Sequence, residues 1–87
     1  MTKEWSDHAW DEYVSWQIMD KRVLKRINML LEDIDRNGYQ GIGKPEQLKG
    51  NWQGYWSRRI DEKNRLVYRI HDGRMKIAQC GTHYGDK

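Results

Sequence analysis

The first half of the chain repeats apolar side chains at the spacing of an α-helix, in two separate stretches. The first stretch follows a capping residue, Ser6 or Asp7. Its apolar members share one helical face: Trp10, Tyr13, Val14 and Ile18. The second follows another capping candidate, Asp20, and ends at Asn37-Gly38, where glycine supplies a left-handed residue. Its stripe comprises Val23, Leu24, Ile27, Leu30, Leu31 and Ile34. The pattern predicts two consecutive helices, close enough in sequence to form a hairpin.

The second half of the chain alternates in the manner of β-strands. Three predicted strands follow one another at hairpin spacing: 55–61, 64–71 and 74 to about 82. Asp72-Gly73, between the last two, is a signal for a tight turn. The middle segment turns Leu66, Tyr68 and Ile70 to one face and Arg65, Val67 and Arg69 to the other. Segment 3–6 is short enough for an edge strand, and segment 39–54 is typical of a long loop. We therefore predict an α+β fold, with two N-terminal helices packed on one face of a small antiparallel sheet.

Size and composition fit one small domain, residues 1–87. The chain has five Trp and five Tyr but no Phe, and we expect most of the Trp side chains to pack in the core. Cys80 is the only cysteine, so there is no internal disulfide; it lies in an apolar run and should also be buried. No apolar run is long enough for a signal peptide or a membrane span, so a cytoplasmic location is the default expectation.

The net charge of +3 is unevenly distributed. Residues 1–43 contain six Lys or Arg and eight Asp or Glu, whereas residues 44–76 contain nine and four. A basic half on so small a domain favours a polyanionic partner such as a nucleic acid. The scattered His and Cys show no metal-ligand spacing, and no glycine-rich phosphate loop precedes a helix, so we expect no metal and no cofactor.

RNA can be cleaved by its own 2′-hydroxyl when three roles are filled. A base removes the hydroxyl proton, cations stabilise the charge on the phosphate oxygens, and an acid protonates the departing 5′-oxygen. Glu46 is an isolated carboxylate that neighbouring lysines would keep ionised, as a base requires. Arg65 presents a planar, permanently charged fork that matches phosphate. His83 can hold and release a proton near neutrality, as an acid requires.

Each of these residues also fits a plainer interpretation. Glu46 could be a solvated loop carboxylate, Arg65 a solvent-facing strand residue and His83 part of a frayed terminus. Four further cations fit either an RNA-binding role or simple solubility: Arg58, Arg69, Arg74 and Lys76. Strict alternation along the last strand does not bring His83 beside Arg65, and a bulge or bend at Gly81 would be one way to reorient the end.

Several segments together resemble the YoeB/Txe family of bacterial toxins, within the RelE-like group. They are 44–51, 55–60 and 64–70, with His83-Tyr84 near the end. The resemblance implies a RelE-like fold and suggests a role for each of several residues. Glu46 matches the proposed general base, Arg65 contacts the scissile phosphate, and His83 belongs to a pair implicated in activity. Lys49 and Arg59 match positions that hold the phosphate backbone, and Tyr84 could stack on a base or hold a phosphate.

The resemblance also implies an activity and partners. Similar toxins are mRNA interferases that cut mRNA in the A site of the 70S ribosome, without a metal. They are paired with a YefM-like antitoxin, contact operator DNA mainly through that antitoxin, and can form homodimers. Two other classes of function remain open: a non-catalytic domain that docks on RNA or the ribosome, and a partner of an antitoxin that serves chiefly as co-repressor.

Overall fold

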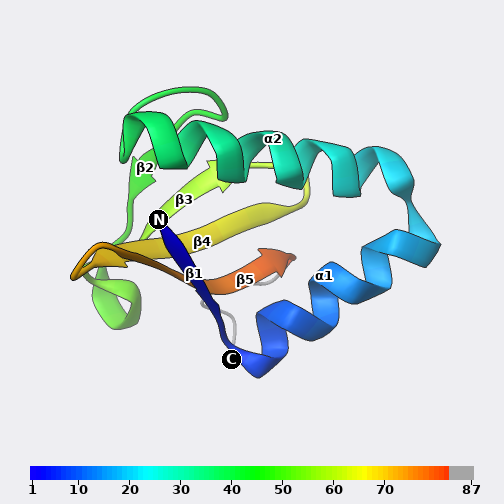
Figure 1. Cartoon of the computed structure of the whole chain (residues 1–87), viewed down its shortest axis with the longest axis horizontal. Helices are drawn as coiled ribbons and strands as arrows, with labels where there is room; N and C mark the ends of the chain where they lie inside the picture. Colours follow the sequence, from blue (N-terminus) through cyan, green and yellow to red (C-terminus); the bar gives the residue numbers. More distant parts are fainter. Residues whose placement is uncertain (83–87) are drawn as a thin grey trace.

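The structure of the chain is a computed structural model, and it describes residues 1–82. Two helices follow a short first strand, and the remaining strands come after them (Figure 1). The helices are α1 (Asp7–Met19) and α2 (Lys21–Asn37), with a short 3-10 helix, η1 (Gly50–Trp52). The strands are β1 (Thr2–Trp5), β2 (Glu46–Gln47), β3 (Trp56–Arg59), β4 (Arg65–His71) and β5 (Arg74–Gly81). The predicted long loop therefore contains a strand and a helical turn of its own.

The strands form one sheet in the order β1-β5-β4-β3-β2. The pairs β3–β4 and β4–β5 are antiparallel, as predicted, and the unpredicted β2 is antiparallel to β3, whereas β1 lies parallel to β5 at the edge. The sheet is thus mixed rather than purely antiparallel. Parallel pairing is possible here because the chain between β1 and β5 includes both helices and three strands, far more than the dozen or so residues that parallel neighbours require.

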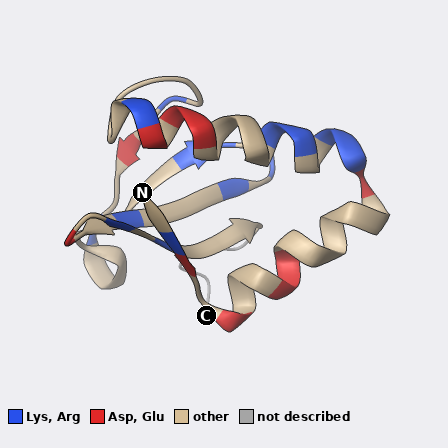
Figure 2. Cartoon of the chain, viewed as in Figure 1, with Lys and Arg blue, Asp and Glu red and all other residues tan. Residues whose placement is uncertain are grey.

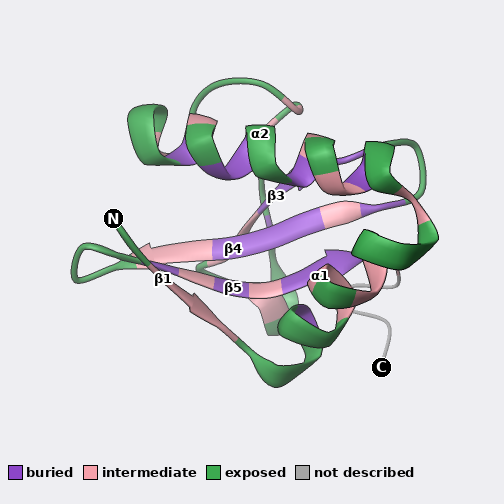
Figure 3. Ribbon diagram, turned by 45° about the vertical axis from the view of Figure 1, so that its right-hand side comes forward, coloured by how far each residue is buried: buried purple, intermediate pink, exposed green. Residues whose placement is uncertain are grey.

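The core lies between the helices and one face of the sheet (Figure 3). The buried stripe of α2 matches the prediction and comprises Val23, Ile27, Leu30, Leu31 and Ile34. It faces Leu66 and Tyr68 of β4 and Met75, Ile77 and Cys80 of β5. The alternation predicted for β4 is therefore confirmed, because Leu66 and Tyr68 point toward the helices.

Only Tyr13 of the predicted apolar face of α1 packs against the core. Trp10, Val14 and Ile18 are exposed, Ile18 by 88%, and Met19 beside them is 68% exposed. Ala9 is instead the buried residue of this helix. The helix rests on the core through Ala9 and the half-buried rings of Tyr13 and Trp16, so its aliphatic stripe is left on the surface. We call these residues, Trp10, Val14, Ile18 and Met19, the α1 stripe.

Three of the five Trp side chains pack against the core as predicted: Trp5, Trp16 and Trp56. Trp10 is half exposed, in edge contact with Trp5. Trp52 lies in η1 and makes a T-shaped contact with Tyr55, with ring centroids 5.2 Å apart. Large aromatic side chains with a polar edge can cover a core without being fully buried. Trp16 is an example, since its ring packs on the core and its N–H donates to the Cys80 carbonyl at 2.8 Å.

A register shift in β5 changes which side chains share a face. Val67 is opposite Gln79, but the next residue of β4, Tyr68, is opposite Ile77, so Ala78 is an extra residue. The Ala78 carbonyl accepts a hydrogen bond from the Ser6 hydroxyl at 3.1 Å. The bulge therefore lies at Ala78 and not at Gly81.

Candidate functional site

The face of the sheet that points away from the helices carries the candidate residues. Side chains directly opposite one another on paired strands point to the same face. The register aligns Glu46 with Ser57, Ser57 with Val67 and Val67 with Gln79. These residues form one transverse row across β2, β3, β4 and β5, and Glu46 stands exposed at its end. We call this surface the open face.

The adjacent row of the open face contains two arginines. Arg59 is directly opposite Arg65, and Arg65 is directly opposite Gly81. Arg59 is thus the diagonal neighbour of Glu46, at about 7–8 Å between their backbones. Two like charges directly opposite one another on paired strands repel each other and destabilise the sheet. Within residues 1–82 no carboxylate forms an ion pair with either arginine. The arrangement leaves both positive charges available to an anion.

The turn between β3 and β4 holds the Arg65 side chain. One guanidinium nitrogen, Nη1, donates to the carbonyls of Asp61 at 2.7 Å, Asn64 at 3.1 Å and Glu62 at 3.3 Å. The other nitrogens, Nε and Nη2, have no acceptor among residues 1–82. The turn therefore fixes the orientation of the fork while leaving donors for a bound phosphate.

Asp61 in turn fixes the conformation of this turn. Its Oδ1 accepts from the backbone N–H groups of Asn64 at 2.7 Å and Lys63 at 2.9 Å, and the Asn64 amide also donates to the carboxylate. Burial raises the pKa of Asp61, but these hydrogen bonds and the charge of Arg65 outweigh it and leave the pKa below its ordinary value. The turn is thus built on an ionised carboxylate.

The bulge at Ala78 decides what lies opposite Arg65. Without it, continued alternation from Ile77 would turn Gln79 toward the helices. With it, Gln79 and Gly81 both belong to the open face. The α1 residue Glu12 secures this end of β5, since its carboxylate accepts from the Cys80 N–H at 2.8 Å. The predicted acid His83 and the predicted contact Tyr84 follow Gly81 in sequence but lie outside the described residues.

The cations singled out from the sequence do not all lie on the open face. Lys49 is exposed at the start of η1, beyond the paired residues of β2, so the sheet register does not place it on the open face. Arg59 and Arg65 do share that face. Of the cations left open by the sequence, Arg74 pairs with Glu4 at 2.9 Å.

Arg58 is excluded from the open face. It points toward the helices, and its side chain is fully buried. Its Nη1 donates to Asp33 at 2.7 Å, its Nε donates to the Tyr68 hydroxyl at 3.1 Å, and its remaining donors bind loop carbonyls. Both interpretations left open by the sequence, RNA binding and surface solubility, are wrong for this residue. Arg58 instead anchors the loop after α2.

Cys80 is confirmed as a core residue. Burial, with a contribution from the Glu12 charge, raises the pKa of the thiol to about 12. The thiol therefore stays protonated near neutral pH, which is unsuited to a nucleophile. Within residues 1–82, no three His, Cys, Asp or Glu side chains gather as a metal site would need. Neither helix of that part of the chain has the length and hydrophobicity to cross a membrane.

Comparison with protein families matches residues 5–84 to the YoeB-like toxin of bacterial type II toxin-antitoxin systems. The chain belongs to this family. Toxin YoeB of Escherichia coli K12 is 51% identical over 80 residues, which cover 92% of this chain and 95% of that protein. The resemblance inferred from segments 44–70 and the His83-Tyr84 pair is therefore confirmed.

Solved structures of YoeB toxins have the same fold. The YoeB/ParE toxin from Agrobacterium tumefaciens superposes with a TM-score of 0.91 and 44% identity, over 97% of this chain and 100% of that one. YoeB from Staphylococcus aureus, solved as a heterotetrameric YoeB–YefM complex and as a YoeB dimer, superposes with a TM-score of 0.90 and 49% identity, over 97% of this chain and 98% of that one. The predicted α+β fold is thereby confirmed.

Two residues of the open face were not singled out by the sequence. Ser57 and Gln79 are buried polar residues in the row of Glu46, at 2% and 4% exposure. The Gln79 amide donates to the Gly81 carbonyl at 3.2 Å, opposite Arg65. Strand alternation could have indicated Ser57, because it lies between Trp56 and Arg58 in β3 and therefore points to the opposite face from them. No such signal existed for Gln79, because its orientation depends on the bulge.

Proposed function

We propose that this toxin is a ribosome-dependent mRNA endoribonuclease that inhibits translation by cutting mRNA in the ribosomal A site. The observation that supports the proposal is the open face. A carboxylate, Glu46, and two cations without ion-pair partners in residues 1–82, Arg59 and Arg65, lie there in adjacent rows on three strands. Glu46 and Arg59 are exposed and Arg65 is half-buried, so these three side chains can meet a polymer that lies across the sheet.

The proposed chemistry is transesterification by the RNA itself. Glu46 removes the proton of a 2′-hydroxyl, the 2′-oxygen attacks the adjacent phosphorus, and the bond from phosphorus to the 5′-oxygen breaks. His83 gives a proton to the departing 5′-oxygen. The products are a 2′,3′-cyclic phosphate and a 5′-hydroxyl, so atoms and charge balance without a cofactor. Each proton transfer is worth roughly 10²–10⁴ in rate.

Arg65, Arg59 and Lys49 have the electrostatic role in this scheme. Charge grows on the phosphate oxygens as the 2′-oxygen attacks, and donors that are already oriented stabilise it without reorganisation. The hydrogen bonds between Arg65 and the β3–β4 turn support this role. Nη1 donates to carbonyls of the turn, which limits the rotation of the guanidinium group. Tyr84 would stack on a base or hold a phosphate.

The direct test is cleavage of end-labelled mRNA on programmed ribosomes, with EDTA controls. We expect discrete A-site cuts by the native chain and losses of roughly 10²–10⁴ in rate for Glu46→Gln and His83→Ala. Arg65→Ala should reduce the rate by roughly 10²–10³. Arg74→Gln is the matched control, because that cation is already paired with Glu4.

Three results would contradict parts of the proposal. Translational arrest with intact mRNA, unchanged by Glu46→Gln and His83→Ala, would replace the nuclease with a non-catalytic module that docks on RNA or the ribosome. Cleavage of protein-free mRNA at rates comparable to ribosome-bound mRNA would remove the ribosome dependence. Normal growth on expression without an antitoxin would favour a co-repressor.

The partners proposed for this chain follow its charge distribution. A YefM-like antitoxin would offer an acidic segment to residues 44–76, whose Lys and Arg side chains include those on β3 and β4 (Figure 2), and the complex would reach operator DNA through the antitoxin. Self-association would instead use the α1 stripe, because α1 contains acidic residues and no Lys or Arg, which disfavours an acidic partner there. The protein would act in the bacterial cytoplasm, with the ribosomes.

A further inference from the structure

A second basic pair lies on the open face, at the other end of β4 from Arg65. Arg69 of β4 is directly opposite Lys76 of β5, so two positive side chains share one face at about 4.5–5.5 Å between their Cβ atoms. Both are half-buried. Among residues 1–82 neither forms an ion pair, whereas Arg74, two positions from Lys76, does so with Glu4. We call Arg69 and Lys76 the distal basic pair.

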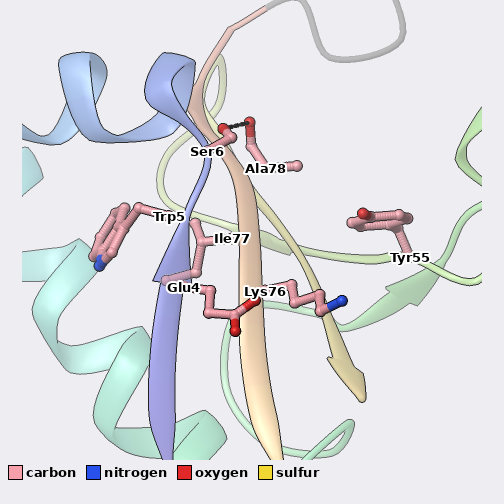
Figure 4. Close-up of a pocket in the computed structure, with 7 residues that line it drawn as sticks. All are labelled: Glu4, Trp5, Ser6, Tyr55, Lys76, Ile77 and Ala78. Atoms are coloured by element: carbon pink, nitrogen blue, oxygen red, sulfur yellow. Dashed lines mark hydrogen bonds between the residues drawn. The ribbon is translucent and has the colours of Figure 1, made fainter. Parts of the chain in front are cut away.

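An aromatic ring stands beside the distal basic pair. Tyr55 and Lys76 line one cavity of about 250 Å³, whose inner wall includes Ser6 and Ala78 (Figure 4). In that view the Lys76 side chain extends away from β1, toward the side where Tyr55 lies. The cavity is smaller than the roughly 300–1,000 Å³ of sites for drug-sized ligands. It therefore suits one group of a polymer rather than a whole cofactor.

The local structure holds Tyr55 in place, and Arg69 lies beside it. The Tyr55 N–H donates to the Trp52 carbonyl at 2.9 Å, its carbonyl accepts from the Leu48 N–H at 2.9 Å, and the Trp52 ring meets the Tyr55 ring edge-on at 84°. The Arg69 guanidinium lies along the neighbouring Gly54, since its central carbon is 3.8 Å from where a Cβ on that glycine would be. A cation and a ring thus lie next to each other at this turn.

We infer that the distal basic pair and Tyr55 form a further subsite for single-stranded RNA, with a phosphate between Arg69 and Lys76 and a base on the Tyr55 ring. Stacking on an aromatic platform beside cations is how proteins bind single strands without base readout. Arg69 is four positions along β4 from Arg65, or about 13 Å. A flexible single-stranded RNA spans this distance with a few nucleotides.

The choice of RNA over an acidic peptide rests on two observations. The face of an aromatic ring stacks on a nucleic-acid base, and every nucleotide offers a base and a phosphate together. The subsite also shares its face with Glu46, Arg59 and Arg65, so one strand can run across both. Glu4 lies beside Lys76 in the β1–β5 register and also lines the cavity, but its carboxylate pairs with Arg74 at 2.9 Å and forms no ion pair with Lys76.

The first experiment measures binding without cleavage. The probe is a fluorescein-labelled, fully 2′-O-methylated single-stranded RNA, whose anisotropy is followed at several salt concentrations. We expect Arg69→Gln with Lys76→Gln to reduce the slope of log K against log salt by about 0.7, because the pair holds one phosphate and each neutralised phosphate of a single strand adds about 0.7 to that slope. Tyr55→Ala should weaken binding roughly 5- to 150-fold. Tyr55→Phe keeps the ring and should bind within about twofold of the native chain.

Lys21→Gln with Lys25→Gln is the matched control, because it also removes two positive charges, both exposed on α2 and away from the open face. An equal reduction of the slope in this control and in the double variant would overturn the subsite, since general charge would then explain the binding. Weaker binding to an acidic antitoxin peptide with unchanged binding to the RNA probe would also overturn it.

The RNA could be mRNA or ribosomal RNA, and a second measurement separates them. Weaker sedimentation of the double variant with ribosomes that lack mRNA would assign the subsite to ribosomal RNA. Normal sedimentation with a higher KM and an unchanged kcat for mRNA cleavage would assign it to mRNA. The inference rests on the proposed function for its choice of RNA, but the 2′-O-methylated probe reports binding alone. A native chain that binds this probe through Tyr55 yet cuts no mRNA would refute the nuclease and keep the subsite.

Discussion

The guanidinium of Arg58 donates to the carboxylate of Asp33 at 2.7 Å, and the Arg58 side chain is fully buried. The same guanidinium binds the carbonyls of Gly38, Gln40 and Ile42, each at 2.8 Å. One side chain of β3 therefore joins α2, the loop after it and the sheet. Its neighbour Arg59 points to the open face, so two adjacent arginines of one strand have separate functions.

Arg58→Ala should destabilise the fold strongly and Arg59→Ala should not. Removing Arg58 leaves Asp33 unpaired and several carbonyls unsatisfied, which costs about 3–5 kcal/mol of unfolding free energy. Arg59 is exposed, so its removal should change the stability by no more than about 0.5 kcal/mol. Urea unfolding at equal protein concentration measures both. Equal stability of the two variants would contradict the structural role of Arg58.

The stability of the protein should fall in acid. The hydrogen bond from Arg58 holds the pKa of Asp33 below its ordinary value, and that from Lys3 does the same for Asp35. A carboxyl group whose pKa is lowered by folding stabilises the fold fully above its unfolded pKa. This contribution is lost as the pH falls through the folded pKa. We therefore expect the unfolding free energy to decline from about pH 5 downward, through and below the ordinary aspartate range.

Asp33→Asn tests the assignment of this decline. The variant should be much less stable than the native chain at pH 7, and the difference should shrink toward about pH 3 as the native carboxyl group becomes protonated. Urea unfolding across this range is the measurement. A stability difference that does not change with pH would show that the ionised form of Asp33 is not what Arg58 stabilises.

Ser6→Ala should lower stability and disturb the open face. The Ser6 hydroxyl accepts from the Ala9 N–H at 3.0 Å as the cap of α1 and donates to the bulge carbonyl of Ala78 at 3.1 Å. Removal of a cap costs about 1 kcal/mol, and removal of the second hydrogen bond adds to it. Ser15→Ala is the control, since that hydroxyl donates only to the Glu12 carbonyl of its own helix. Thermal unfolding compares them, and equal melting temperatures would contradict the prediction.

Ile18→Glu should prevent self-association through the α1 stripe. Ile18 is 88% exposed, so the change is tolerated in the single chain, but a second copy would have to bury the new charge. Sedimentation equilibrium should show a dimer for the native chain and a monomer for the variant. Met29→Glu makes the same kind of change on α2, where Met29 is 45% exposed, and should leave the mass unchanged. Equal disruption of the dimer in both variants would place the interface elsewhere.

Elements whose signals are local could be predicted from the amino-acid sequence. The apolar stripe of α2, the caps Ser6 and Asp20 and the alternation of Leu66 with Arg65 in β4 all appear where predicted. Local signals suffice there because helix spacing, caps and strand alternation depend on near neighbours in the chain. The candidate residues Glu46 and Arg65 were identified from their local chemistry together with the family resemblance, and Arg59 from the resemblance alone.

The tertiary structure alone decided how these elements face one another. The α1 stripe is apolar at helical spacing and yet exposed, because α1 sits on the core through Ala9 and its aromatic neighbours. Arg58 is buried while Arg59 is exposed, and Ala78 shifts the register so that Gly81 lies opposite Arg65. Strand pairing, burial of a charge and a bulge depend on partners far away in the sequence, and no local pattern specifies those partners.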